Sequence, residues 1–187
     1  MRRLIKMLLA LALIAAALAV LVLLTSHVYR TPSSAMEPTL HCAKPAAGCE
    51  AKHGDRVLVS RVLYRLRDPR RGDIVAFRLP TAATVACGSF FNEAVIKRLI
   101  AVPGDRFREK SGFVYVNGKK LNEPYVTADN RDTETFPQVT LRKDQYLVLG
   151  DNRSSSCDSR RWGPVPRKDL IGPVIATYWP LSRISIR

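Results

Sequence analysis

The sequence lacks the motifs that usually mark nucleic-acid or nucleotide binding. It has no zinc-finger spacing, no glycine-rich phosphate loop and no basic segment interleaved with aromatic residues. Acidic residues are also few: 16 Asp and Glu accompany 30 Lys and Arg among 187 residues, so the net charge is +14. Such a surplus favours anionic partners. With nucleic acid disfavoured, we expect the basic surface to face anionic membrane lipid.

Acidic residues are absent from the first 30 positions, where basic residues flank a long apolar run. The run, Met7–Leu24, has 18 residues without a polar side chain. As a helix it would extend about 27 Å, close to the roughly 30 Å of a bilayer core. A cleaved signal peptide is the alternative, but its apolar core has about 7–15 residues and is followed by a small-x-small site. The length of the run and the residues after it favour a retained membrane anchor.

The charges around this run predict how the chain lies across the membrane. Arg2, Arg3 and Lys6 precede it, and Arg30 follows it. Three cations before the run favour a cytoplasmic N-terminus, although Arg30 weakens the contrast. We therefore expect a cytoplasmic N-terminus of residues 1–6, a single transmembrane anchor of residues 7–26 and an extracytoplasmic domain of residues 27–187.

Periodic apolar stretches of the kind that a helical domain needs are lacking after residue 30. Short segments rich in β-branched and apolar residues alternate with turn residues instead. These segments are Arg56–Tyr64, Asp73–Phe77, Val95–Val102, Phe113–Leu121, Gln145–Leu149 and Ile171–Trp179. Asn117-Gly118 is a strong hairpin signal, and Pro173 predicts an edge strand or a bulge. The pattern predicts a mainly β domain on one membrane helix.

The four cysteines fit an oxidising compartment. Cys42 and Cys49 flank a short loop with turn formers, so we expect these two to pair, which leaves Cys87 for Cys157. Four cysteines allow three pairings, and the sequence cannot select one of them. Zinc is disfavoured because no Cys-x2-Cys or His-x3-His spacing occurs and the three histidines are scattered.

Lys97 lies in an unusual position, between Ile96 and Leu99-Ile100 inside an apolar run. In a strand, its amine would sit among apolar neighbours, where desolvation lowers the pKa of a lysine. A lysine with a lowered pKa can act as a general base near neutral pH. The alternative is ordinary, because one solvated lysine in a strand is common.

Four segments stand out together: Pro32–Leu40, Arg71–Phe77, Ile96–Asp105 and Gly150–Gly163. Each alone has a simple explanation as a turn, a strand entry, a solvated pair or a loop. In order and spacing they resemble bacterial type I signal peptidases, which are membrane-anchored serine–lysine proteases. The resemblance implies an antiparallel β-sheet catalytic domain whose active-site face lies against the bacterial cytoplasmic membrane. It also implies that the partners are signal peptides of exported preproteins, with small residues at positions −1 and −3.

One residue departs from the family pattern. The family reads Ser-x-Ser-Met-x-Pro-Thr-Leu, in which the second serine is the nucleophile, and this chain has Ala35 at that position. A methyl group cannot attack a peptide carbonyl, so no acyl-enzyme forms there. Ser34 is a poor substitute, because in an extended segment its side chain would point to the other face.

The other site residues match the family by position. Lys97 matches the general base, Ser33 the side-chain donor of the oxyanion hole, and Ser156 the serine that orients the lysine amine. The backbone N–H of residue 35 would be the second oxyanion donor, which a change from Ser to Ala does not remove. Supporting ion pairs are expected between Asp151 and Arg98 and between Asp158 and Arg160. By the same resemblance, the residues that would line the substrate pockets are Tyr29, Thr31, Met36, Leu40, Val95 and Ile96.

Three hypotheses follow. The first is a signal peptidase whose nucleophile has been replaced by design, which leaves an inactive or substrate-trapping form. The second is a natural pseudoenzyme that binds signal peptides without cleaving them, which the codon at position 35 of the encoding gene would reveal. The third is a specialised relative that processes one pilus or conjugation precursor. None of them implies a metal, a nucleotide or another cofactor.

Overall fold

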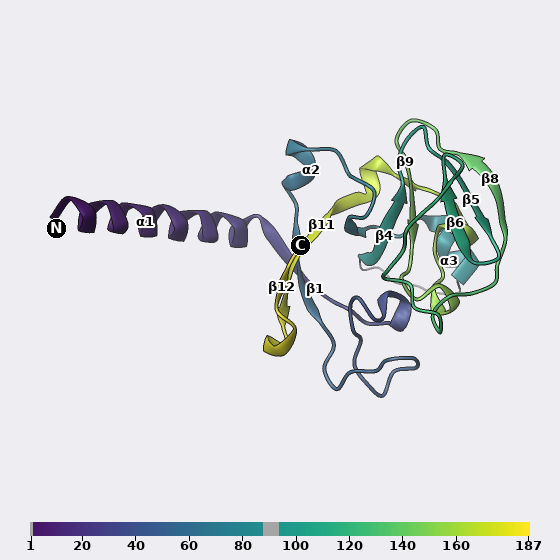
Figure 1. Cartoon of the computed structure of the whole chain (residues 1–187), viewed down its shortest axis with the longest axis horizontal. Coiled ribbons are helices and arrows are strands. Elements are labelled where there is room, and N and C mark those ends of the chain that lie inside the picture. The colour runs from purple at the N-terminus through teal and green to yellow at the C-terminus, as the bar shows by residue number, and fades with distance from the viewer. Residues whose placement is uncertain (1, 88–93) are drawn as a thin grey trace.

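A long N-terminal helix stands off a β domain in the computed structural model, which describes residues 2–87 and 94–187 (Figure 1). This helix, α1, covers Arg2–Leu24. Its residues Arg2–Val22 are long and apolar enough to cross a membrane. Compared with the predicted segment 7–26, the helix starts earlier and ends two residues sooner, because strand β1 (Ser26–Arg30) already begins at Ser26.

Two sheets build the domain, and their strands pair antiparallel. The larger has the order β1-β2-β11-β3-β4-β9-β10, with β12 against β11. Its other strands are β2 (Arg56–Ser60), β3 (Ile74–Phe77), β4 (Val95–Ala101), β9 (Gln145–Leu149), β10 (Val165–Pro166), β11 (Leu170–Trp179) and β12 (Ser185–Ile186). The predicted mainly β, antiparallel fold class is thus confirmed.

The smaller sheet has the order β7-β6-β5-β8. Its strands are β5 (Arg106–Lys110), β6 (Phe113–Val116), β7 (Lys119–Lys120) and β8 (Phe136–Thr140). The predicted hairpin is confirmed between β6 and β7. Asn117 and Gly118 both take positive φ, at 54° and 81°, as a two-residue turn of this hand requires.

Short helical elements connect the strands. The α-helices are α2 (Leu63–Leu66), α3 (Thr81–Cys87) and α4 (Ser159–Trp162). The 3-10 turns are η1 (Ser34–Met36), η2 (Arg153–Ser155), η3 (Arg167–Asp169) and η4 (Leu181–Arg183). Both expected disulfides are present, Cys42–Cys49 and Cys87–Cys157.

Strands β3 and β4 lie at the centre of the core and are buried on both faces. Val75 and Leu99 pack into one apolar cluster, whereas Ala76 and Ile96 pack into a second one. The end of β4 joins a third cluster, which it shares with the smaller sheet. Because neighbours surround β4 on every side, a side chain that it carries has little freedom to move.

One detail of the strand prediction is wrong, and one alternative that the sequence left open is decided. The strand expected over Arg56–Tyr64 ends at Ser60, because the Ser60 hydroxyl accepts a hydrogen bond from Leu63 N (3.2 Å) at the start of α2. Pro173 does not lie on an edge, since β11 pairs with β2 on one side and β3 on the other. Register shifts occur on both sides of Pro173, so the bulge is confirmed and the edge is not.

Candidate active site

A mostly apolar cavity of about 410 Å³ lies where several distant segments meet. The end of β1 and the turn η1 form one wall, the first half of β4 forms another, and α3 with the loop after η2 closes the rest. Its lining includes Ser33, Ala35 and Lys97. The structure therefore brings together three of the four positions that the sequence assigned to catalysis, and the fourth, Ser156, is bonded to Lys97.

The segment that carries Ala35 is folded as a 3-10 turn, η1, rather than as the extended segment that we expected. Asn152 N donates to the Ala35 carbonyl at 3.1 Å, which ties the turn to the loop after β9. A methyl group at Gly48 would approach Ser34 Oγ to 2.8 Å, so the Ser34 hydroxyl lies against the disulfide loop. Among the described residues that line the cavity, Ser34 does not appear.

Lys97 is held in the middle of β4, opposite Val75 of β3, with only 4% of its surface exposed. Its Nζ donates to Ser156 Oγ at 2.8 Å. Burial lowers the pKa of this amine from 10.5 to about 8, although the nearby Asp158 and Asp151 carboxylates act in the opposite direction. The amine is thus available in its neutral form close to physiological pH.

Ser156 is oriented from its other side by Asp158. The Ser156 hydroxyl hydrogen-bonds to Asp158, whose pKa is lowered overall: burial alone would raise it, but bonds from Arg160 and Ser156 outweigh that effect. Arg160 Nε donates to Asp158 Oδ1 at 2.9 Å, and Gly150 N donates to Asp158 Oδ2 at 3.1 Å. The expected Asp158–Arg160 pair therefore exists and fixes the hydroxyl that contacts the lysine.

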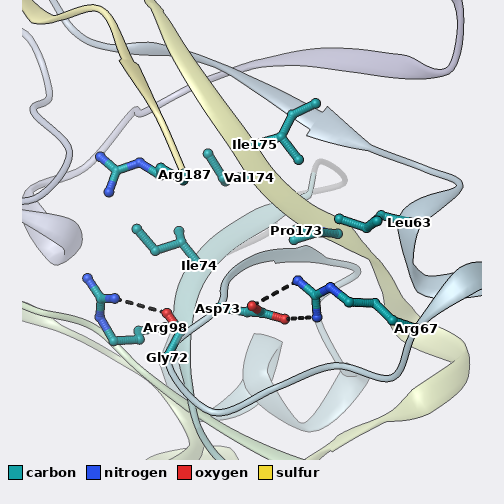
Figure 2. A pocket seen from close by; sticks show the side chains of 10 residues that line it. All are labelled: Leu63, Arg67, Gly72, Asp73, Ile74, Arg98, Pro173, Val174, Ile175 and Arg187. Carbon is teal, nitrogen blue, oxygen red and sulfur yellow. Dashed lines mark hydrogen bonds and ion pairs between the residues drawn. The ribbon is translucent and has the colours of Figure 1, made fainter. Parts of the chain in front are cut away.

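The second expected pair, Arg98 with Asp151, is bidentate. Arg98 Nε and Nη2 donate to the two carboxylate oxygens at 2.8 and 2.7 Å. Arg98 Nη1 also donates to the Gly72 carbonyl at 3.0 Å, at the edge of a separate hollow (Figure 2). In that hollow, Arg67 pairs with Asp73 in the same bidentate way. These contacts clamp β3, β4 and the loop after β9 together.

The residues predicted for the substrate pockets divide into two groups. Tyr29, Thr31, Met36, Val95 and Ile96 line the cavity. Leu40 is not among the described residues that line it; it is fully buried in the core cluster that also contains Met36. Leu40 follows the 3-10 turn by one helical turn, since its N–H donates to the Met36 carbonyl at 2.9 Å, and this places its side chain in the core.

The cavity also has lining residues that the sequence did not indicate. They are Arg30, Pro32, Leu79, Cys87, Ala94, Ser155 and Cys157. Only the expected Cys87–Cys157 pair could have predicted some of these residues. A bridge to the residue after Ser156 brings the segment around Cys87 to the site.

A model of the signal peptidase, peptidase S26 family matches residues 1–179 of the chain. The chain belongs to the signal peptidase S26 family. It is 45% identical over 155 residues to the probable signal peptidase I-2 of Synechocystis sp., and the match covers 83% of this chain and 64% of that relative. This chain thus spans a little less than two thirds of that relative's length.

Other family members are similar over comparable lengths. Signal peptidase IB of Staphylococcus aureus strain COL is 32% identical over 173 residues, which cover 84% of this chain and 80% of the relative. The crystal structure of a signal peptidase I from Enterococcus faecalis matches with 30% identity and a TM-score of 0.47, over 58% of this chain and 97% of that one.

Gly150 is a position in this S26 family member where only glycine fits. A methyl group there would lie 2.3 Å from Ser156 Oγ and 2.5 Å from the Ala35 carbonyl oxygen. We expect Gly150→Ala to push the Ser156 loop away from η1 and to lower the free energy of unfolding by about 1–3 kcal/mol. Urea unfolding measures this loss, with Ser154→Ala, at an exposed position of the same loop, as the control. Equal stability of the two variants would contradict the close packing around Gly150.

The Cys87–Cys157 bridge joins α3 to the loop that carries Ser156 and closes a chain segment of 70 residues, whereas Cys42–Cys49 spans 7. Because longer loops lose more entropy on cross-linking, removing the long bridge is expected to cost about 4 kcal/mol of unfolding free energy, against about 2 kcal/mol for the short one. Urea unfolding of the two double Cys→Ser variants measures the difference. A larger loss from the short bridge would contradict this expectation.

Proposed function

We propose that this S26 family member has the site of a membrane-bound endopeptidase that removes N-terminal signal peptides from exported preproteins by a Ser/Lys dyad. In this chain the nucleophile position is Ala35, so the site binds the substrate and does not cleave it. The observation that carries the proposal is the buried Lys97 amine, which has a pKa of about 8 and is bonded to Ser156 in a cavity that Ala35 also lines.

Each remaining group has a defined role in this proposal. With serine at position 35, Lys97 would take the hydroxyl proton and later activate the water that hydrolyses the acyl-enzyme. Ser33 and the backbone N–H of residue 35 would stabilise the oxyanion. The ion pairs of Arg98 and Arg160 would hold the loop that carries Ser156.

The apolar lining of the cavity supports a preference for small apolar side chains. Its walls near η1 and β4 are apolar, with Met36, Val95 and Ile96 among the lining residues. Apolar pockets of limited depth accept a methyl group and reject larger side chains, which fits small residues at positions −1 and −3 of the substrate. The substrate would bind as an extended strand that adds backbone hydrogen bonds to those of the site.

The N-terminal helix supports a location at the bacterial cytoplasmic membrane. We infer that α1 is a single-pass anchor with its N-terminus in the cytoplasm, so that the catalytic domain lies outside the cytoplasm and next to lipid. Tethering at the bilayer raises the effective concentration of membrane-bound preproteins at the site.

A natural pseudoenzyme that binds signal peptides is the second candidate. The alanine at position 35 prevents cleavage, and it also favours this candidate, because its methyl group lines a cavity that is otherwise formed. The codon at position 35 in the source genome separates a natural alanine from an introduced one.

A paired cleavage assay tests the proposed function. The chain and its Ala35→Ser variant are placed in liposomes with a preprotein that has Ala at −1 and −3. Cleavage by the variant alone supports the Ser/Lys site. Cleavage by neither, with signal-peptide binding retained, supports the pseudoenzyme, whereas cleavage by both would place the nucleophile elsewhere.

A further inference from the structure

We propose that Glu37, His41 and Glu50 bind a divalent transition-metal ion, with Zn²⁺ as the ion that suits them. Each side chain offers one ligand atom, and the three atoms lie within 4.8 Å of one another. The cluster lies directly after η1 and beside the Cys42–Cys49 loop. None of its three residues is among the described residues that line the catalytic cavity, so this site is distinct from it.

The strongest observation is that a buried carboxylate oxygen and an imidazole nitrogen face each other at ion-pair distance. Glu37 Oε2 lies 2.5 Å from His41 Nδ1, and the Glu37 side chain is only 1% exposed. Within residues 2–87 and 94–187, neither atom has a hydrogen-bond partner of acceptable geometry. At this distance the two side chains form an ion pair when the imidazole is protonated, and a metal ion would replace that proton once the two atoms move apart to the spacing of metal ligands.

The surrounding backbone holds the ligands in place. Glu37 Oε1 accepts a hydrogen bond from Cys42 N at 3.0 Å, which fixes the carboxylate and leaves Oε2 directed at His41. The backbone of His41 makes two hydrogen bonds with Asp55, at 2.9 and 2.7 Å. Such outer contacts orient metal ligands in known sites.

Glu50 reaches the same place because of the disulfide. The Cys42–Cys49 bridge brings the residue after Cys49 back to the segment that contains Glu37 and His41. Glu50 is exposed, so it can move to complete the site at little cost. The site thus joins two sides of a loop that the disulfide already closes.

The ligand set points to a transition metal rather than to Mg²⁺ or Ca²⁺. Zn²⁺ accepts both imidazole nitrogen and carboxylate oxygen, with water available for a fourth position, whereas Mg²⁺ and Ca²⁺ prefer oxygen ligands alone. Ligand atoms on one tetrahedral Zn²⁺ lie about 3.3 Å apart, so small side-chain rotations would suffice. Sequence patterns built on Cys-x2-Cys or His-x3-His do not include Glu-x3-His with a distant Glu, which explains why zinc was disfavoured.

A bound ion would clamp the residue that follows η1. Glu37 N donates to the Ser34 carbonyl at 3.0 Å, and η1 carries the backbone N–H of residue 35. An ion on Glu37 would therefore restrain this turn without lining the catalytic cavity. This role is structural, and it requires neither cleavage activity nor a serine at position 35.

The test is calorimetric titration of the tag-free full chain, in detergent micelles after removal of metal by a chelator, with ZnCl2. We expect one equivalent to bind, no comparable binding of MgCl2, and a loss of Zn²⁺ affinity of at least about tenfold in Glu50→Gln and in His41→Gln. His53→Gln, which changes an exposed histidine of the same loop, is the matched control and should bind like the parent.

Two results would overturn the proposal. One is the absence of a stoichiometric Zn²⁺ event in the folded parent chain, which would leave Glu37 and His41 as a simple ion pair. The other is unchanged Zn²⁺ affinity in Glu50→Gln, which removes an exposed ligand and so leaves the fold intact. An anomalous diffraction peak between Glu37 and His41 in Zn²⁺-soaked crystals would confirm the site directly.

Discussion

Replacing Ala35 with serine is expected to raise the rate of preprotein cleavage by about 10⁵–10⁶-fold over the parent chain. Loss of a serine nucleophile from a protease costs an effect of this order, because the remaining groups stabilise the oxyanion but form no acyl-enzyme. The added oxygen would stand beside the cavity that Lys97 lines. Initial rates with a fluorogenic peptide that has Ala at −1 and −3 measure the change.

The neighbouring serines supply matched controls for this gain. The Ser34 hydroxyl lies against Gly48 and not in the cavity, so Ala35→Ser with Ser34→Ala should keep most of the restored activity. Ala35→Ser with Ser156→Ala should lose a large part of it, because Lys97 Nζ loses its 2.8 Å contact. A folded Ala35→Ser variant that cleaves no preprotein would contradict the Ser/Lys assignment.

The same residues show which parts of the site can be predicted from sequence. The apolar neighbours of Lys97 indicated a desolvated amine, but they left an ordinary solvated lysine open, and the resemblance to a family was needed to assign it as the general base. The β6–β7 hairpin could be found because Asn117-Gly118 sets the turn locally. Resemblance to a family supplied the other predicted site positions, since they lie far apart in the chain and only tertiary structure joins them.

The errors share a physical origin in long-range contacts. The segment around Ala35 has the composition of a turn, but its 3-10 form is fixed by Asn152, more than a hundred residues away. This turn sends Leu40 into the core rather than into the cavity. By contrast, Pro173 predicted an edge strand or a bulge, and the pairing of its strand with two neighbours selects the bulge, where register shifts accommodate the proline.

The proposed metal site could not be predicted from the sequence for a related reason. Glu37 and His41 are four residues apart, but only the disulfide places Glu50 next to them. A pattern search that looks at one segment at a time cannot detect ligands that a covalent bridge brings together.

The activity of the Ala35→Ser variant is expected to rise with pH through about pH 8. Lys97 accepts the serine proton only when it is neutral, and burial lowers its pKa to about 8. The rate should therefore fall about tenfold for each pH unit below that value and level off above it. Lys97→Met in the same background should abolish cleavage by about 10⁴-fold or more. A rate independent of pH between 6 and 9 would contradict the dyad.

The pH dependence of the free energy of unfolding gives a second test of the Lys97 amine, and the direction of that dependence follows from the shift in its pKa. The pKa of Lys97 is about 8 in the folded chain and 10.5 as its ordinary value, so the unfolded state binds more protons between these two pH values. The cost of burying the charged amine is fully present below pH 8, amounts to about 3 kcal/mol, and disappears as the pH rises to 10.5. Lys97→Met in the parent chain should therefore increase the free energy of unfolding at pH 7 by up to about 3 kcal/mol, and this gain should vanish above pH 10.5. A destabilised Lys97→Met at pH 7 would mean that the lysine holds the fold, whereas a stabilised variant, together with loss of cleavage when Lys97→Met is added to Ala35→Ser, would show that its burial serves catalysis.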